Sequence, residues 1–159
     1  MRIIVPFAPG GGADIVSRLM SPYLQATLGQ LVIVENRAGA GGRIANEALK
    51  AAPKDGLTLL MTPIATMGIF PHSYAGNLRY DPLKDFAPVS LVSQRGSMLL
   101  AHAAFAPNNV KELVAYAKAS PGKLNYASVG AGSASHLSAE RFMFSAGIKA
   151  VHVPFKGGG

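Results

Sequence analysis

The order of elements predicted in the first third of the chain constrains its fold more than any other feature. Residues 2–7, 31–36 and 57–62 are short aliphatic and β-branched runs typical of buried strands. Between them, 14–28 and 43–52 carry apolar residues at helical spacing. Strands that alternate with helices in this way form parallel sheets joined by right-handed crossovers. The sequence therefore predicts an α/β fold.

The same kind of order returns in the last third of the chain. A helix is predicted over 109–122, where a Pro-Gly pair ends it, and a strand over 124–129. A second helix is predicted over 136–147 and a second strand over 149–155. We therefore expect a second α/β unit, with a glycine loop between its first strand and the helix that follows.

The middle of the chain is less regular. Residues 63–86 are rich in turn-forming residues, so we expect an irregular connection there. Residues 87–102 are apolar enough to hold one or two further strands. At the ends of the first helix, Asp14 is a candidate N-cap and Gly29 a candidate C-cap.

Composition excludes several classes of protein. Of 159 residues, 49% are hydrophobic and 14% charged, which is typical of a globular chain. The net charge of +7 is scattered, which favours attraction of small anions over nucleic-acid binding. The absence of cysteine excludes disulfides and thiolate metal sites, and no spacing of His, Asp and Glu suggests a metal site. No apolar run reaches the roughly 18 residues that a membrane span needs.

Glycine loops lie between predicted strands and helices at 9–14, 39–42 and 130–135. The first N–H groups of a helix lack internal partners, and glycine lets a ligand approach them closely. Such a loop can therefore bind an anion. A plain tight turn is the alternative, above all at 39–42. Nucleotide binding is not favoured, because GAGGRIAN and GAGSAS each lack the third glycine of the dinucleotide fingerprint and PGGGAD is not a P-loop.

The sequence indicates no catalytic centre. Ser133 and Ser135 precede His136, but adjacent side chains of this kind cannot easily meet, and no nucleophile elbow surrounds them. Asp14 is better explained as a helix cap than as an acid or base. His152 lies in a predicted strand, where we expect a packing role.

Five segments carry a resemblance that covers essentially the whole chain: IIVPFAPGGGAD, LGQLVIVENRAGAGGRIANEALKAAPKDGLTLL, YDPLKDFAPVSLV, SPGKLNYASVGAGSASHLSAERF and VHVPFKGG. In this order they resemble the solute receptors of tripartite tricarboxylate transporters, the Bug/TctC type. The resemblance implies a periplasmic-binding-protein type II-like fold, with two α/β lobes and mainly parallel sheets. Residues 1–95 would be the N-terminal part of the first lobe and 96–159 that of the second, so that both lobes are incomplete.

The resemblance also implies a function. Such a receptor would capture a small organic carboxylate between its lobes in the periplasm and deliver it to membrane transporter subunits. The ligand would be a di- or tricarboxylate, an acidic amino acid or an aromatic monocarboxylate, and no cofactor, metal or catalysis would be involved. Carried over by motif, the ligand-binding residues are Pro9, Gly10, Gly11, Gly12, Asp14, Thr66, Gly132, Ser133, Ser135, His136, Phe155, Lys156 and Gly157.

The chain also departs from the family pattern. Met67 and Phe70 stand where many relatives carry polar residues, which favours a monocarboxylate with an apolar or aromatic body. Two alternatives stay open: an enzyme acting on a small carboxylate on the same scaffold, and a truncated remnant that binds nothing.

The two ends of the chain raise a further expectation. The chain stops at FKGGG, where another helix should follow, and no signal-peptide pattern precedes Arg2. We therefore expect a portion of a longer protein, or a natural chain that lacks its second half. In either case exposed sheet edges should favour self-association.

Overall fold

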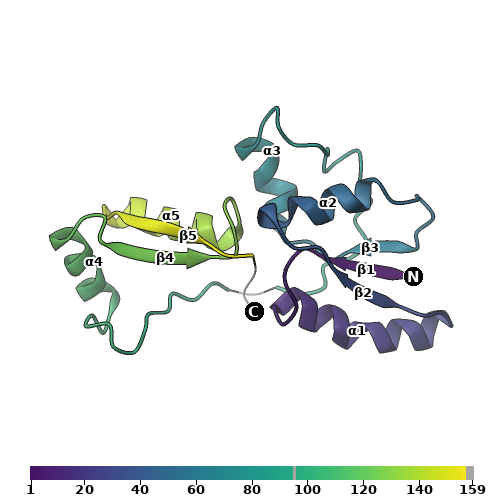
Figure 1. Cartoon of the computed structure of the whole chain (residues 1–159), viewed down its shortest axis with the longest axis horizontal. Helices are drawn as coiled ribbons and strands as arrows, with labels where there is room; N and C mark the ends of the chain where they lie inside the picture. Colours follow the sequence, from purple (N-terminus) through teal and green to yellow (C-terminus); the bar gives the residue numbers. More distant parts are fainter. Residues whose placement is uncertain (95, 157–159) are drawn as a thin grey trace.

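The computed structural model describes residues 1–94 and 96–156, and it contains two separate parallel sheets with helices packed on them (Figure 1). The first sheet has the order β2-β1-β3, formed by Ile33–Asn36, Arg2–Val5 and Thr58–Leu60. The second pairs β4, Leu124–Ser128, with β5, Ala150–Pro154. The predicted α/β class with parallel sheets is therefore confirmed. We call the part from β1 to α3 the first lobe and the part from α4 to β5 the second lobe.

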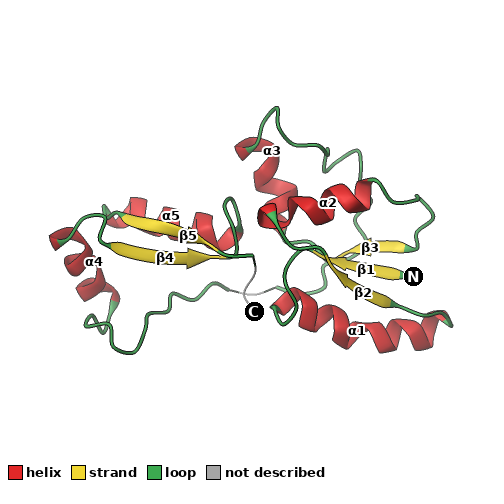
Figure 2. Ribbon diagram, in the orientation of Figure 1, coloured by secondary structure: helices red, strands yellow, loops and turns green. Residues whose placement is uncertain are grey.

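Strand β1 is the centre of the first lobe. It pairs on both sides, so that Ile4 lies opposite Glu35 of β2 and Leu60 of β3. Ile4 and Val5 are fully buried. Helices α1, Gly12–Leu28, and α2, Arg43–Lys50, lie on opposite sides of the sheet (Figure 2). A strand covered on both faces must be apolar along its length, which explains the run RIIV.

The predicted ends of α1 are half correct. Gly29 adopts the left-handed conformation, with φ of 63°, and its N–H donates to the carbonyl of Gln25 at 3.0 Å. The predicted N-cap at Asp14 is wrong, because the helix begins two residues earlier and Gly11 occupies the cap position without a side-chain bond. Asp14 lies in the first turn, where its carboxylate reaches back to the N–H of Gly10.

Both helices of the second lobe begin at side-chain caps. The Asn109 side chain accepts from the N–H of Glu112 at 2.9 Å and starts α4, Val110–Ala119. Ser133 caps α5, Ala134–Ala146, by accepting from the N–H of His136. The cap explains why α5 starts two residues before the predicted 136–147.

The prediction of strands within 87–102 is wrong for the part of this segment that the structure describes. The segment forms neither helix nor strand, and apolar side chains such as Val89, Leu91 and Met98 are about 80% exposed. A β-branched run becomes a strand only when a neighbouring strand satisfies its backbone, and none lies beside it here among the described residues. The exposed apolar surface favours the self-association expected above, which stays a prediction.

Residues 63–86 are more regular than expected. A π-helical stretch, η2 at Ala65–Ile69, runs directly into the short helix α3, Phe70–Ser73. Phe70 anchors this stretch, since it is fully buried. The helical geometry was hidden from sequence analysis by the proline and glycine residues around it.

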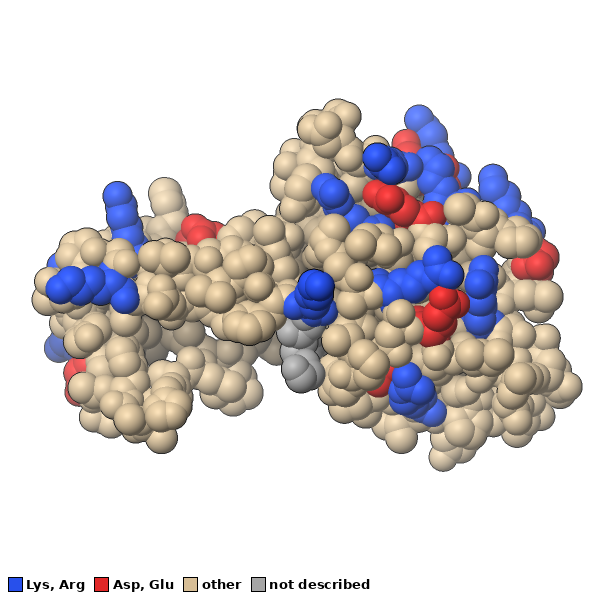
Figure 3. All heavy atoms as spheres, viewed as in Figure 1, with Lys and Arg blue, Asp and Glu red and all other residues tan. Residues whose placement is uncertain are grey.

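Charged side chains do not form a single patch on the face that Figure 3 shows. Basic side chains are dispersed over this face, with acidic ones among them on the first lobe. In the described part of the chain, every helix is too short or too polar to cross a bilayer. The predicted boundary between 1–95 and 96–159 adjoins residue 95, which lies outside the described residues, and it stays a prediction.

Candidate ligand-binding site

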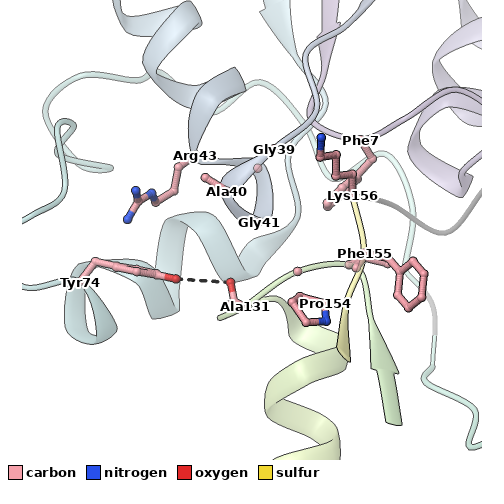
Figure 4. A pocket seen from close by; sticks show the side chains of 13 residues that line it. Phe7, Gly39, Ala40, Gly41, Arg43, Tyr74, Ala131, Pro154, Phe155 and Lys156 are labelled. Atoms are coloured by element: carbon pink, nitrogen blue, oxygen red, sulfur yellow. Dashed lines mark hydrogen bonds between the residues drawn. The ribbon is translucent and has the colours of Figure 1, made fainter. Parts of the chain in front are cut away.

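A cavity of about 270 Å³ lies where the two lobes meet (Figure 4). The first lobe contributes Phe7 from the loop after β1, the loop after β2 with the start of α2, and the residue that caps the end of α3. The other wall comes from the loop after β4 and from the end of β5 with the residues that follow it. The lining residues are Phe7, Gly39, Ala40, Gly41, Gly42, Arg43, Tyr74, Val129, Gly130, Ala131, Pro154, Phe155 and Lys156. The cavity thus lies beyond the carboxyl ends of parallel strands, where α/β proteins bind ligands.

The wall from the first lobe is the glycine loop after β2. Gly39, Gly41 and Gly42 all have positive φ, at 131°, 66° and 105°. The loop forms the short helix η1, Ala40–Gly42. A Cβ on Gly41 would lie 2.8 Å from the carbonyl oxygen of Ala131 in the second lobe. The two lobes therefore touch through bare backbone here, which explains glycine at this position.

Phe70 packs into the same junction. Its ring lies 3.0 Å from the Cβ position of Gly41 and 2.8 Å from that of Gly132. It also meets Tyr74 edge-to-face, with ring centroids 5.0 Å apart, and the Tyr74 hydroxyl donates to the Ala131 carbonyl at 3.4 Å. Phe70 thus packs between the lobes, and because it is fully buried it is absent from the described cavity lining.

The charges around the cavity favour an anion. Its described lining contains two cationic side chains, Arg43 and Lys156, and no acidic one. The guanidinium carbon of Arg43 lies 4.4 Å from the centre of the Tyr74 ring, and the Nε of Arg43 is buried without a hydrogen-bond partner. Cations in a partly closed hollow raise the local concentration of small anions. No group of three His, Asp or Glu residues capable of holding a metal was found among the described residues.

The glycine loop after β1 does not form this wall. Pro9, Gly10, Gly11 and Gly12 are absent from the described cavity lining. Gly10 is exposed, and its N–H donates to the Asp14 carboxylate at 3.0 Å. In the structure, the N–H of Gly10 in this loop therefore binds the carboxylate of Asp14, which belongs to the same chain segment.

Asp14 is part of a buried polar cluster rather than of the cavity. Its carboxylate, 4% exposed, accepts from Arg18 at 2.9 Å and from the Asn36 side chain at 2.9 Å. These bonds, with that from Gly10, hold the pKa of Asp14 down at about 2. Thr66 is also buried, and its hydroxyl donates to the Pro63 carbonyl at 2.9 Å. The ligand contacts expected for both side chains stay untested predictions.

The predicted residues of the second lobe lie close to the cavity but do not all line it. Phe155 and Lys156 form part of the wall, whereas Gly132 packs against Phe70. The Ser133 hydroxyl caps α5, and that of Ser135 accepts from the N–H of Val129 at 3.3 Å. Gly157 lies outside the described residues.

His136 belongs to a stacked aromatic cluster behind the loop. Its Nδ1 accepts from the N–H of Gly132 at 3.1 Å, and its ring stacks on His152 with centroids 4.0 Å apart. His152 stacks in turn on Tyr126 and shares a hydrogen bond of 2.6 Å with the Ser128 hydroxyl. The packing role expected for His152 therefore agrees with its position. His136 fixes the glycine loop after β4 through the hydrogen bond that it accepts from Gly132.

The cluster predicts a pH dependence of stability. Burial, and then the neighbouring His136, lower the pKa of His152 from its ordinary 6.5. The unfolded chain therefore takes up this proton at a higher pH than the folded chain, so stability should fall as the pH drops from 6.5 through the lower native pKa. Urea unfolding midpoints between pH 8 and 5 measure this. His152→Phe should flatten the dependence of the unfolding midpoint on pH, and His102→Gln, at an exposed position, should not. If His152→Phe keeps the wild-type dependence, His152 is not the source of the loss of stability at low pH.

The residues that sequence analysis missed are those of the loop after β2 and the end of α3. Gly39, Gly41 and Arg43 line the cavity, although a plain turn was one interpretation of 39–42. The signal was present as consecutive glycines at a strand-to-helix junction. Only the contact with the second lobe distinguishes this loop from that at 9–14.

The family model described as "Tripartite tricarboxylate transporter family receptor" matches residues 16–159. The chain belongs to this receptor family. Protein BugT of Bordetella pertussis is a relative, 36% identical over 159 residues, which are all of this chain and 49% of BugT. The chain thus spans about half the length of the curated relatives it matches.

Solved structures of similar proteins show the same fold. MatC from Rhodopseudomonas palustris with bound malate is 35% identical with a TM-score of 0.86, over 99% of this chain and 53% of MatC. The R. palustris protein Rpa4515 with adipate is 30% identical with a TM-score of 0.81, over 99% of this chain and 52% of Rpa4515. The expected family and its periplasmic-binding-protein fold are therefore confirmed.

Proposed function

We propose that this receptor-family chain captures a small organic carboxylate in the cavity between its two lobes and serves delivery of that acid to a tripartite membrane transporter. The observation that carries the proposal is the described cavity lining, where glycine backbone from both lobes and two cations, Arg43 and Lys156, surround a hollow without an acidic side chain. Backbone N–H groups and fixed cations are the groups that bind carboxylates in proteins.

The relatives support the same chemistry. MatC was solved with malate and Rpa4515 with adipate. Malate and adipate are both small diacids. Relatives were also described as a periplasmic transporter and as periplasmic binding protein BugD, which supports a periplasmic location for this chain. The cavity, at about 270 Å³, lies near the small end of ligand sites in proteins, which favours an acid of few atoms.

The preference for an aromatic monocarboxylate loses its main support. It rested on Met67 and Phe70 as apolar side chains, but neither lines the described cavity, and the Phe70 ring is fully buried between the lobes. The two cations come from segments far apart in the sequence, the start of α2 and the residues after β5, which suits an acid with a charge at each end. Among the expected ligands, the structure therefore favours diacids, including acidic amino acids.

A thermal-shift panel tests the proposal. Malate, adipate, aspartate and benzoate would be compared with their uncharged amides. A ligand at a hundred times its Kd stabilises the folded state by about 2.7 kcal/mol, so at least one acid should raise Tm by about 5–10 °C and its amide should not. Silence across all acids would contradict the proposal and favour a remnant that binds nothing. Chemical conversion of a stabilising acid, followed by NMR, would favour the enzyme instead.

A further inference from the structure

Arg43 is placed differently from the other arginines of the first lobe. Arg2, Arg18 and Arg37 each lie within 4 Å of a carboxylate, on Glu35 or Asp14. The Arg43 side chain makes no ion pair or hydrogen bond with another described residue, and its Nε is buried without a partner. A buried donor of this kind costs free energy unless something binds it. The position therefore calls for an acceptor that the chain does not supply.

The side chain is nevertheless held in place. Arg43 is the first residue of α2, and its guanidinium carbon lies 4.4 Å from the centre of the Tyr74 ring (Figure 4). The Tyr74 hydroxyl donates to the carbonyl of Ala131 in the second lobe, and this hydrogen bond orients the ring on which Arg43 stacks. Stacking on an aromatic ring leaves the edge of the guanidinium, with its row of donors, open to a carboxylate.

Arg43 as a whole is half-buried, so part of its side chain is accessible although its Nε is covered. It lines the cavity between the lobes and also a neighbouring hollow, whose lining includes Glu47 and Arg79. Glu47 lies one helical turn along α2 from Arg43 but makes no ion pair with it. Arg79 adds a positive charge to the same hollow, which balances the negative charge of Glu47. On the other side of the cavity, Lys156 carries the second positive charge of the described lining.

We infer that Arg43 is the residue by which this receptor selects diacids, by binding one carboxylate directly through its guanidinium while the other carboxylate faces Lys156. The inference rests on the proposed function, which it deepens. Tyr74 is a positioning residue, because it acts through Arg43. A diacid bound in this way pairs both of its charges with cations of the cavity, and a monoacid of the same length cannot.

The test compares acids that differ only in the second carboxylate. Adipate and hexanoate have the same number of carbons, and titration calorimetry on the full chain gives the Kd of each. Hydrogen bonds to charged groups contribute about 1.5–3 kcal/mol, which is about 10- to 100-fold in affinity. Wild type should therefore bind adipate at least tenfold more tightly than hexanoate. Arg43→Gln should remove most of that preference, because adipate would lose one of its two charge contacts and would then bind, like hexanoate, through a single carboxylate.

Two further variants make the result specific. Arg43→Lys keeps the charge without the planar fork, so it should retain part of the preference. Arg79→Gln removes a cation from the neighbouring hollow and should keep the full preference. Circular dichroism melting would show that each variant is folded. If Arg43→Gln and Arg43→Lys both keep the wild-type preference, the Arg43 assignment is overturned while the proposed function stands. If wild type binds neither these acids nor those of the panel above, the proposed function itself fails.

Discussion

Gly41→Ala should lower the affinity for the bound acid at least tenfold. The added Cβ would lie 2.8 Å from the Ala131 carbonyl oxygen, closer than real contacts allow, and 3.0 Å from the Phe70 ring, which is a tight contact. Ala131 belongs to the second lobe and its backbone cannot turn away as a flexible side chain would. The lobes must therefore separate at the wall of the cavity, and a misplacement of about 1 Å is enough to disrupt a site of this kind.

A matched control separates this contact from backbone strain. Gly10 also has positive φ, at 87°, but a Cβ there would meet nothing within 4 Å. Gly10→Ala should therefore pay the same conformational cost of about 1–2 kcal/mol in stability and keep its affinity for the acid. The two Kd values, measured by calorimetry, decide the matter. Equal affinity in both variants would mean that the loop after β2 does not shape the site.

Asp14→Ala should lower the free energy of unfolding by about 2–3 kcal/mol, because Arg18, the Gly10 N–H and the Asn36 side chain would lose the buried carboxylate that accepts their hydrogen bonds. In a chain of this length, that corresponds to a fall in Tm of about 5–10 °C. The exposed Asp55 offers a matched control, since its carboxylate accepts only from the N–H of Leu57. Asp55→Ala should change Tm by less than about 2 °C.

The same carboxylate predicts an acid limit. The pKa of Asp14 is lowered from 3.8 to about 2 in the folded chain, so its stabilising effect is present above pH 3.8 and lost as the pH falls towards 2. Unfolding midpoints of Asp14→Asn should therefore fall less steeply over that window than those of wild type. An identical slope in the two proteins would contradict the role assigned to this cluster.

The elements that periodicity could predict are those whose packing is local. The run RIIV forms a buried central strand because helices cover it on both sides, and Gly29 ends α1 because the left-handed turn there requires glycine. In these cases sequence and structure agree because the physical cause lies within a few residues. The strands predicted in 87–102 fail for the opposite reason: β-propensity acts only where a neighbouring strand completes the ladder.

The candidate site was partly predictable for a related reason. The sequence indicates glycine loops at strand ends, yet it does not say which of them meet in space. The loop at 9–14 binds its own Asp14, whereas 39–42 faces the second lobe at Gly130 and Ala131. The lack of a hydrogen-bond partner at the Arg43 Nε is likewise a property of the fold, since it depends on which carboxylates the helices place beside the guanidinium.

A crystal structure of the chain grown with adipate tests the central claim most directly. The account predicts the acid in the cavity between the lobes, with carboxylate oxygens about 2.7–3.2 Å from backbone N–H groups of the 39–42 or 129–131 segments and from the Arg43 guanidinium. An acid bound at the loop of residues 9–12, with no acid in the cavity between the lobes, would contradict it.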